Sequence, residues 1–139
     1  MKVFVYYIGK PKDPHANALA ADYIQRAGHY ATLQMSEIRP GPANPLAKHP
    51  NAKKILVDPA GRAMDSNGFA KLFADAEMLG HDLVFGVGGH DGFPAAWQDR
   101  ADMLLSLSAM TMPHELARAV LAEQIYRAFA ILRGHPYPR

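Results

Sequence analysis

Three short segments hold residue types that suit ligand binding, and each follows an apolar run typical of a buried strand. They are Asp58–Gly61, Gly88–Gly92 and Ser108–Pro113, which are rich in glycine, small residues and polar residues. In α/β proteins, the loops at the carboxyl ends of parallel strands meet at one edge of the sheet, where ligands usually bind. The sequence therefore predicts that the three segments converge on one site.

The glycines of Gly88–Gly92 have two interpretations. Glycine lets backbone N–H and C=O groups approach a ligand without a Cβ atom between them, but glycines after a strand also simply form turns. The GVGG run at 86–89 lacks the spacing of a dinucleotide fingerprint, and the chain contains no Gly-Lys-Ser/Thr phosphate loop. A nucleotide phosphate is therefore a poor candidate ligand. A ligand held by main-chain hydrogen bonds and apolar contacts is a better one.

Strand-like and helix-like patterns alternate along the chain, and these elements must position the three segments. Apolar and β-branched runs predict strands at 3–8, 30–38, 55–57, 82–87 and 104–107. Helical spacing predicts helices at 17–27, 66–79, 94–103 and 113–132. A proline-rich, irregular connection is expected at 39–54, a turn at 58–61 and a helix N-cap at Ser66. The alternation predicts an α/β fold with a mostly parallel sheet flanked by helices.

Composition narrows the class of protein. The chain has 139 residues, of which 49% are hydrophobic, so we expect one domain spanning 1–139. There is no cysteine, and the seven histidines lack ligand spacing, so no metal site is expected. No apolar run approaches the roughly 20 residues that span a membrane, so we expect a cytoplasmic protein with no membrane partner.

The predicted helix 113–132 has more apolar surface than one sheet face needs. Leu116, Val120, Ile125, Phe129 and Leu132 share one side, with Arg118 placed elsewhere. Further apolar and small residues widen this side, and a second copy of the chain would cover them.

The C-terminal sequence resembles the RlmH family. The signature segments are SLSAMTMPHEL at 106–116 and AEQIYRAFAILRGHPY at 122–137, and ILVDPAG and GVGG occur in the family's order. These SPOUT-class methyltransferases use S-adenosylmethionine to methylate N3 of a pseudouridine in helix 69 of bacterial 23S rRNA. The resemblance implies a SPOUT-type fold with a C-terminal deep trefoil knot, a homodimer, and 23S rRNA in the assembled ribosome as partner.

The resemblance also implies site residues. The cofactor contacts would be Val57, Gly88, Leu107, Ser108, Ala109, Met110, Thr111 and Met112. Proton handling or orientation would fall to His135 or Tyr137, and Arg139 would meet a phosphate or developing charge. For His135, a hydrogen bond to a tail neighbour is the alternative. Positive surface for rRNA would come from Arg118, Arg127, Arg133 and Arg139 of two subunits.

The chain departs from the family pattern at several positions. Pro138 stands where the second tail histidine is usual, His90 stands where a proline is usual, and the region 40–54 is shorter. The alternative function is a knotted homodimer that binds S-adenosylmethionine or RNA without methyl transfer. A flavodoxin-like binding domain without a knot is a third interpretation. His114 is expected to help start its helix, and Asp58 to cap a turn or order the knot without catalysis.

Overall fold

The structure, a computed structural model, describes residues 1–39 and 44–137. Five strands form one sheet in the order β2-β1-β4-β3-β5, and all the described strand pairings are parallel. The strands are β1 (Lys2–Ile8), β2 (Thr32–Ile38), β3 (Ala52–Ala63), β4 (Asp82–Val87) and β5 (Met103–Ser106). The predicted α/β fold with a parallel sheet is confirmed.

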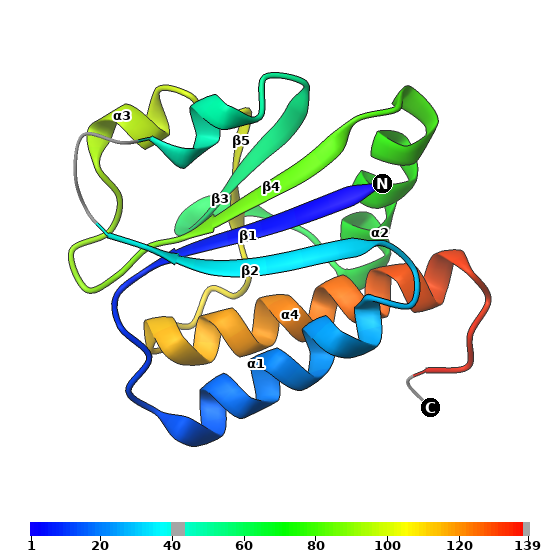
Figure 1. Cartoon of the computed structure of the whole chain (residues 1–139), viewed down its shortest axis with the longest axis horizontal. Helices are drawn as coiled ribbons and strands as arrows, with labels where there is room; N and C mark the ends of the chain where they lie inside the picture. Colours follow the sequence, from blue (N-terminus) through cyan, green and yellow to red (C-terminus); the bar gives the residue numbers. More distant parts are fainter. Residues whose placement is uncertain (40–43, 138–139) are drawn as a thin grey trace.

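Helices cover both faces of this sheet (Figure 1). One face packs against α1 (Pro14–Ala27), α2 (Ser66–Leu79) and α4 (His114–Leu132). The other packs against α3 (Ala95–Gln98) and the short 3₁₀ helix η1 (Pro45–Lys48). The three long helices therefore bury the larger core, and the two short ones cover a smaller one.

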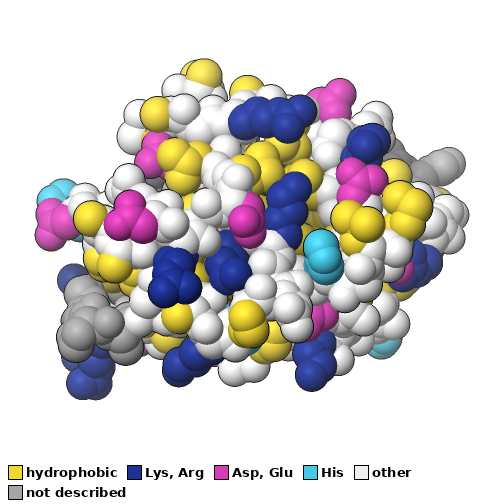
Figure 2. Space-filling model, turned by 90° about the horizontal axis from the view of Figure 1, so that it is seen from above, with side chains coloured by type: hydrophobic (Ala, Val, Ile, Leu, Met, Phe, Trp, Pro, Cys, Tyr) yellow, Lys and Arg dark blue, Asp and Glu magenta, His cyan; other side chains and the backbone are white. Residues whose placement is uncertain are grey.

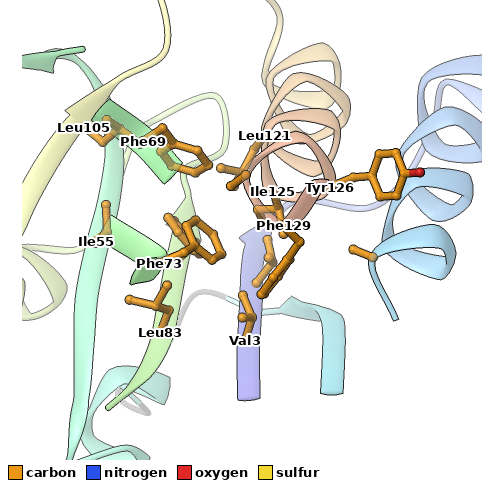
Figure 3. Packing of buried hydrophobic residues seen from close by; sticks show 14 of the residues in the cluster. Val3, Ile55, Phe69, Phe73, Leu83, Leu105, Leu121, Ile125, Tyr126 and Phe129 are labelled. Carbon is orange, nitrogen blue, oxygen red and sulfur yellow. The ribbon is translucent and has the colours of Figure 1, made fainter. Parts of the chain in front are cut away.

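The larger core is built from aromatic and aliphatic side chains that converge from α2, α4 and the sheet (Figure 3). Phe73 of α2 meets Phe129 of α4 edge to face, with ring centroids 5.1 Å apart. Val3 and Leu83 complete this layer from the sheet, and all four side chains are fully buried. Such packing holds the helices at fixed positions on the sheet and so positions the loops at its edge.

The predicted irregular connection 39–54 contains regular structure where it is described. Pro45–Lys48 forms η1, and β3 begins at Ala52; residues 40–43 lie outside the described residues. Leu46 of η1 is fully buried and packs with Trp97 against the second sheet face. The shortened region thus still supplies cover for that face.

Two helices begin elsewhere than predicted. The N-cap of α2 is Asp65 rather than Ser66, because the Asp65 carboxylate accepts a backbone N–H of the first turn at 2.7 Å. Helix α1 begins at Pro14 rather than Asn17, because Asp13 caps it in the same way and proline suits the first helical turn. In both cases the aspartate immediately before the first helical residue determines the start.

Strand β3 is longer than the predicted strand 55–57. Its pairing with β5 shifts register between Val57 and Arg62. Residues 58–61 therefore bulge out of a continuing strand, and the predicted strand-ending turn there is wrong.

Gly61 lies in this bulge, directly against the backbone of β5. A Cβ atom at Gly61 would lie 2.6 Å from the carbonyl carbon of Leu104 and 2.7 Å from the amide nitrogen of Leu105. No side chain fits in that space, so the two chain segments can pass this closely only because residue 61 is glycine.

The predicted side of α4 is only partly buried: Ile125 and Phe129 are fully buried as predicted, but Leu116 is not. Leu116 is 43% exposed, whereas Arg118 is 1% exposed. The reason is that α1 packs closely on α4 through small residues, with Ala20 meeting Ala119 and Ala122 in one buried cluster. Alanines contribute little to a hydrophobic pattern in the sequence. The apolar stripe alone therefore did not predict that the side of α4 facing α1 is buried.

Candidate functional site

A pocket of about 410 Å³ opens at the carboxyl ends of β4 and β5, beside the start of the bulge in β3. Residues 57–59, 87–93 and most of 107–112 line it, together with Gln98, His114 and Ala117. The three segments singled out by their residue types therefore lie around one cavity. Its volume is within the range that small-molecule ligands use.

The pocket includes most of the residues expected to hold the cofactor. Val57, Gly88, Leu107, Ser108, Met110, Thr111 and Met112 all line the cavity. Ala109 is not among the lining residues and is exposed to solvent. The lining thus combines apolar side chains with residues of the glycine loop.

The glycine loop is both a tight turn and part of this lining. Gly89 and Gly92 form an antiparallel bridge, and Gly92 has a φ of +77°, a conformation that favours glycine. A Cβ atom at Gly88 would lie 3.1 Å from the carbonyl carbon of Gly92. Both interpretations of these glycines therefore apply. The segment forms a tight turn, and it also lines the pocket.

Hydroxyl groups shape the segment after β5. Ser106 Oγ donates to the carbonyl of Ser108 at 3.0 Å, and Ser108 Oγ accepts from the Met110 backbone N–H at 2.9 Å. These local bonds replace regular secondary structure between β5 and α4. They leave the following backbone and side chains free to face the cavity.

Two carboxylates and two histidines also line the pocket. Asp58 Oδ1 accepts the Ala60 backbone N–H at 2.8 Å, so its predicted turn-capping bond exists, although within the bulge of β3. Asp91, His90 and His114 are the other ionisable residues of the lining. Within the described residues, no Lys or Arg side chain lines this cavity, and no three His, Asp or Glu side chains are placed to share a metal ion.

Sequence reasoning missed the contribution of the first turns of α4. His114 and Ala117 line the pocket one helical turn apart. The expected role of His114 in starting the helix has no support from a side-chain hydrogen bond, because the N-cap residue is Pro113. His114 and Ala117 are three positions apart and follow directly after a predicted ligand segment. That spacing on a helix could have predicted that both line the pocket.

Glu115 fastens this end of α4 to the chain that follows β1. Its Oε1 accepts the backbone N–H groups of Lys12 at 2.6 Å and Asp13 at 3.2 Å, and the Asn17 amide at 3.0 Å. These hydrogen bonds, the one from the Lys12 backbone first, lower the pKa of Glu115 to about 2. The carboxylate therefore stays charged and keeps the pocket wall attached to α1.

The tail residues lie at the other end of α4. His135 Nδ1 accepts the Tyr137 backbone N–H at 3.2 Å, and Tyr137 OH donates to Glu123 Oε2 at 2.7 Å. Burial, followed by hydrogen bonds to Tyr23 and Glu123, raises the pKa of Tyr137. The Tyr137 side chain thus reaches back to Glu123, midway along the 19 residues of α4, and none of the described tail residues is among those that line the pocket.

Arg139 and Pro138 lie outside the described residues. Of the other arginines expected to contact rRNA, Arg118 is buried and offers no surface charge. Arg127 pairs with Glu123 at 2.6 Å, and Arg133 with Glu77 at 3.0 Å. Much of the expected positive charge is therefore buried or neutralised within the chain.

None of the helices in the described part of the chain has the length and apolar character needed to cross a bilayer.

Comparison with known proteins gives a consistent result. A family model described as "Predicted SPOUT methyltransferase" matches residues 1–138. The chain is 62% identical over 139 residues to "Ribosomal RNA large subunit methyltransferase H" of Solibacter usitatus, with 100% of both chains covered. A protein of the same name from Chromobacterium violaceum is 36% identical over 155 residues, covering 100% of this chain and 99% of the relative.

Two solved structures share the fold. A probable methylase family protein from Haemophilus influenzae has a TM-score of 0.66 at 8% identity, covering 99% of this chain and 70% of that one. A probable methyltransferase from Bordetella pertussis has a TM-score of 0.62 at 13% identity, covering 92% and 93%. Together with the sequence matches along its whole length, this shared architecture means that the chain belongs to the SPOUT methyltransferase family and, within it, to the RlmH family that its C-terminal sequence resembles.

Proposed function

We propose that the protein is an S-adenosylmethionine-dependent methyltransferase that acts on N3 of a pseudouridine in helix 69 of 23S rRNA. The relatives' names support an action on the RNA of the large ribosomal subunit. The observation that carries the proposal is the single pocket that joins Val57, Gly88 and the segment 107–112. A substrate in the ribosome implies a cytoplasmic location.

The pocket suits an adenosine-containing cofactor. Val57, Leu107 and Met112 offer apolar surface, and the glycine loop offers backbone groups within reach of a base or ribose. When bound, S-adenosylmethionine supplies a methyl group on a sulfonium. The residues of the chain would hold the adenosine and exclude water from one side of the reacting atoms.

The reaction requires removal of a proton. If S-adenosylmethionine is held in the pocket, it would supply the methyl group, and the residues of the protein would have to orient N3 toward it and help the N3 proton to leave. A side chain that accepts the proton, or positive charge that favours the N3 anion, lowers the barrier. His135, Tyr137 and Arg139 are the proposed residues for these roles.

Because the described tail residues do not line the pocket of their own chain, we infer that the active unit is a homodimer. If two copies pack their α4 helices antiparallel about a two-fold axis, the tail of one copy approaches the pocket of the other. Leu116 and Ile131, at opposite ends of α4, are 43% and 38% exposed. These side chains give such an interface apolar contacts at both ends.

A trefoil knot is part of the same proposal. The bulge of β3 passes so close to β5 that Gly61 has room only for hydrogen beside Leu104. This approach is what threading of the C-terminal segment past the 58–63 segment requires. A second copy and a knot would together stabilise the loops of the cofactor pocket.

The surface also bears on RNA binding. Figure 2 views the α3 face of the molecule and shows Lys and Arg side chains spread among acidic and hydrophobic ones. The formal net charge of the chain is only +2. A dimer that doubles the charge, and contacts to an assembled ribosome, would strengthen binding to phosphates.

Methylation of ribosomes from a strain that lacks this modification tests the proposal. The purified protein and S-adenosylmethionine should produce methylpseudouridine in helix 69, detected by mass mapping of nucleosides. Cofactor binding without any methylated product would instead favour the binding-only function. The absence of cofactor binding at millimolar concentration would exclude both.

A further inference from the structure

The charged side chains among the described residues that line the pocket are all acidic. Among the described residues that line it, Asp58 and Asp91 are the charged side chains, and no lysine or arginine balances them. The buried cation Arg118 is outside the lining and bonds to the carbonyls of Ile8 and Gly9. A ligand in this cavity therefore meets net negative charge.

The proposed cofactor and its product differ in charge at one atom. S-adenosylmethionine carries a sulfonium in addition to its ammonium and carboxylate groups, so its net charge is positive. S-adenosylhomocysteine has a neutral thioether in the same place and has no net charge. A negative lining attracts the first more strongly than the second.

We propose that Asp58, assisted by Asp91, makes this pocket select the cationic sulfonium cofactor over its neutral thioether product. The inference rests on the proposed function and deepens it by assigning cofactor discrimination to two residues. It also gives a reason for product release, because loss of the methyl group removes the charge that the carboxylates attract.

Asp58 should contribute more to this selection than Asp91, because its carboxylate is held in place. It is partly buried, and its Oδ1 bond to the Ala60 N–H fixes the carboxylate at the pocket wall. A charge that is fixed and partly shielded from water interacts more strongly than a free surface charge. Asp91 is exposed, so solvent and salt screen it more effectively.

Two other ionisable groups face the same cavity, His90 and His114. All measurements are therefore made at one fixed pH, so that the charge of these two side chains is the same for both ligands.

Isothermal titration calorimetry with both ligands tests the proposal. The quantity of interest is the Kd of S-adenosylhomocysteine divided by the Kd of S-adenosylmethionine, for the wild-type protein and for Asp58→Asn and Asp91→Asn. Asparagine keeps an oxygen that can accept the Ala60 N–H, so the bulge should remain intact. Asp65→Asn is the matched control, because Asp65 caps α2 outside this pocket and asparagine is an equally good N-cap.

We expect Asp58→Asn to lower this ratio by about threefold to tenfold, Asp91→Asn by less, and Asp65→Asn not at all. The wild-type ratio should also fall as salt is raised from about 20 mM to about 500 mM, because the shorter Debye length screens the carboxylates. An unchanged ratio in Asp58→Asn would overturn the inference.

Equal weakening of both ligands in Asp58→Asn would also overturn it, because the carboxylate would then hold a part that the two molecules share, such as the ribose. These outcomes differ from failure of the proposed function, in which the wild-type protein binds neither ligand.

Discussion

Arg118 Nη2 donates a hydrogen bond to the backbone carbonyl of Ile8 at 2.9 Å, although 110 positions separate the two residues. The same nitrogen donates to the Gly9 carbonyl at 3.1 Å, and the guanidinium lies 4.0 Å from the centre of the Tyr7 ring. Arg118 Nε and Nη1 have no hydrogen-bond partner among the described residues. A buried cation thus joins the end of β1 to the helix that forms part of the pocket wall.

Replacement of this cation should destabilise the fold. In Arg118→Met, the carbonyls of Ile8 and Gly9 lose their donor inside the protein, and we expect the free energy of unfolding to fall by about 2 kcal/mol. Urea denaturation followed by circular dichroism measures the change. Lys71→Met removes an exposed cation of a surface ion pair and should cost under about 0.5 kcal/mol. Equal losses in the two variants would show that the Arg118 contacts contribute nothing.

Glu115 should make stability depend on acid pH. Its pKa in the folded protein is about 2, below the ordinary value of 4.5, because it accepts backbone and amide hydrogen bonds. A depressed pKa adds stability above pH 4.5, and this contribution is lost as the pH falls from about 4.5 towards about 2. Glu115→Gln should therefore be less stable than wild type at pH 6, and the difference should shrink by pH 3.

Urea midpoints at pH 6, 4 and 3 measure this effect. Asp99→Asn, a change at an exposed residue next to α3, should follow the wild-type pH dependence. A constant gap between Glu115→Gln and wild type at all three pH values would rule out the linkage.

Gly61 and Gly80 should respond differently to alanine. Gly80 ends α2 with a φ of +72° and open space around it, so Gly80→Ala should cost only about 1 kcal/mol of backbone strain. Gly61→Ala would place a Cβ atom 2.6 Å from the Leu104 carbonyl carbon, where only backbone could move. We expect it to cost more than about 2 kcal/mol or to prevent folding. Thermal unfolding of the two variants compares them, and a milder effect at Gly61 would mean that β5 does not pass there.

Tyr137→Phe should separate cofactor binding from methyl transfer. The phenylalanine ring keeps its packing against Tyr126 but loses the hydroxyl that donates to Glu123. Because Tyr137 does not line the pocket of its own chain, calorimetry should show unchanged affinity for S-adenosylmethionine. Methyl transfer to ribosomes should fall if the tail acts in the active site of the partner.

Mixed dimers test that last condition directly. The Gly88→Leu side chain would block the pocket, so this variant is mixed with an equal amount of Tyr137→Phe and the two are refolded together. Random pairing makes half of the dimers mixed, and each mixed dimer has one of its two sites intact. The mixture should therefore recover about a quarter of wild-type activity. Each variant alone should be inactive or nearly so. A mixture no more active than its components would place both functions within one chain.

Much of the architecture follows from local patterns. The β-branched run of β1 and the buried run of β4 lie where their sequences predict, because a strand buried on both faces needs continuous apolar residues. The three polar and glycine-rich segments could also be recognised, since strand ends in a parallel sheet share one edge. The motifs at 106–116 and 122–137 identified the family.

Other features depend on contacts between distant segments, which no local pattern contains. Strand β3 continues past Val57 because β5 pairs with it again at Arg62, and α4 buries Arg118 because the end of β1 offers two carbonyls. Tyr137 packs against Tyr23 and Tyr126 and bonds to Glu123 rather than lining the pocket of its own chain. Residue types and their order thus predict which groups are present and which edge they occupy. Only the packing of the chain against itself decides which of these groups meet, because burial energy and hydrogen bonding are gained between elements rather than within them.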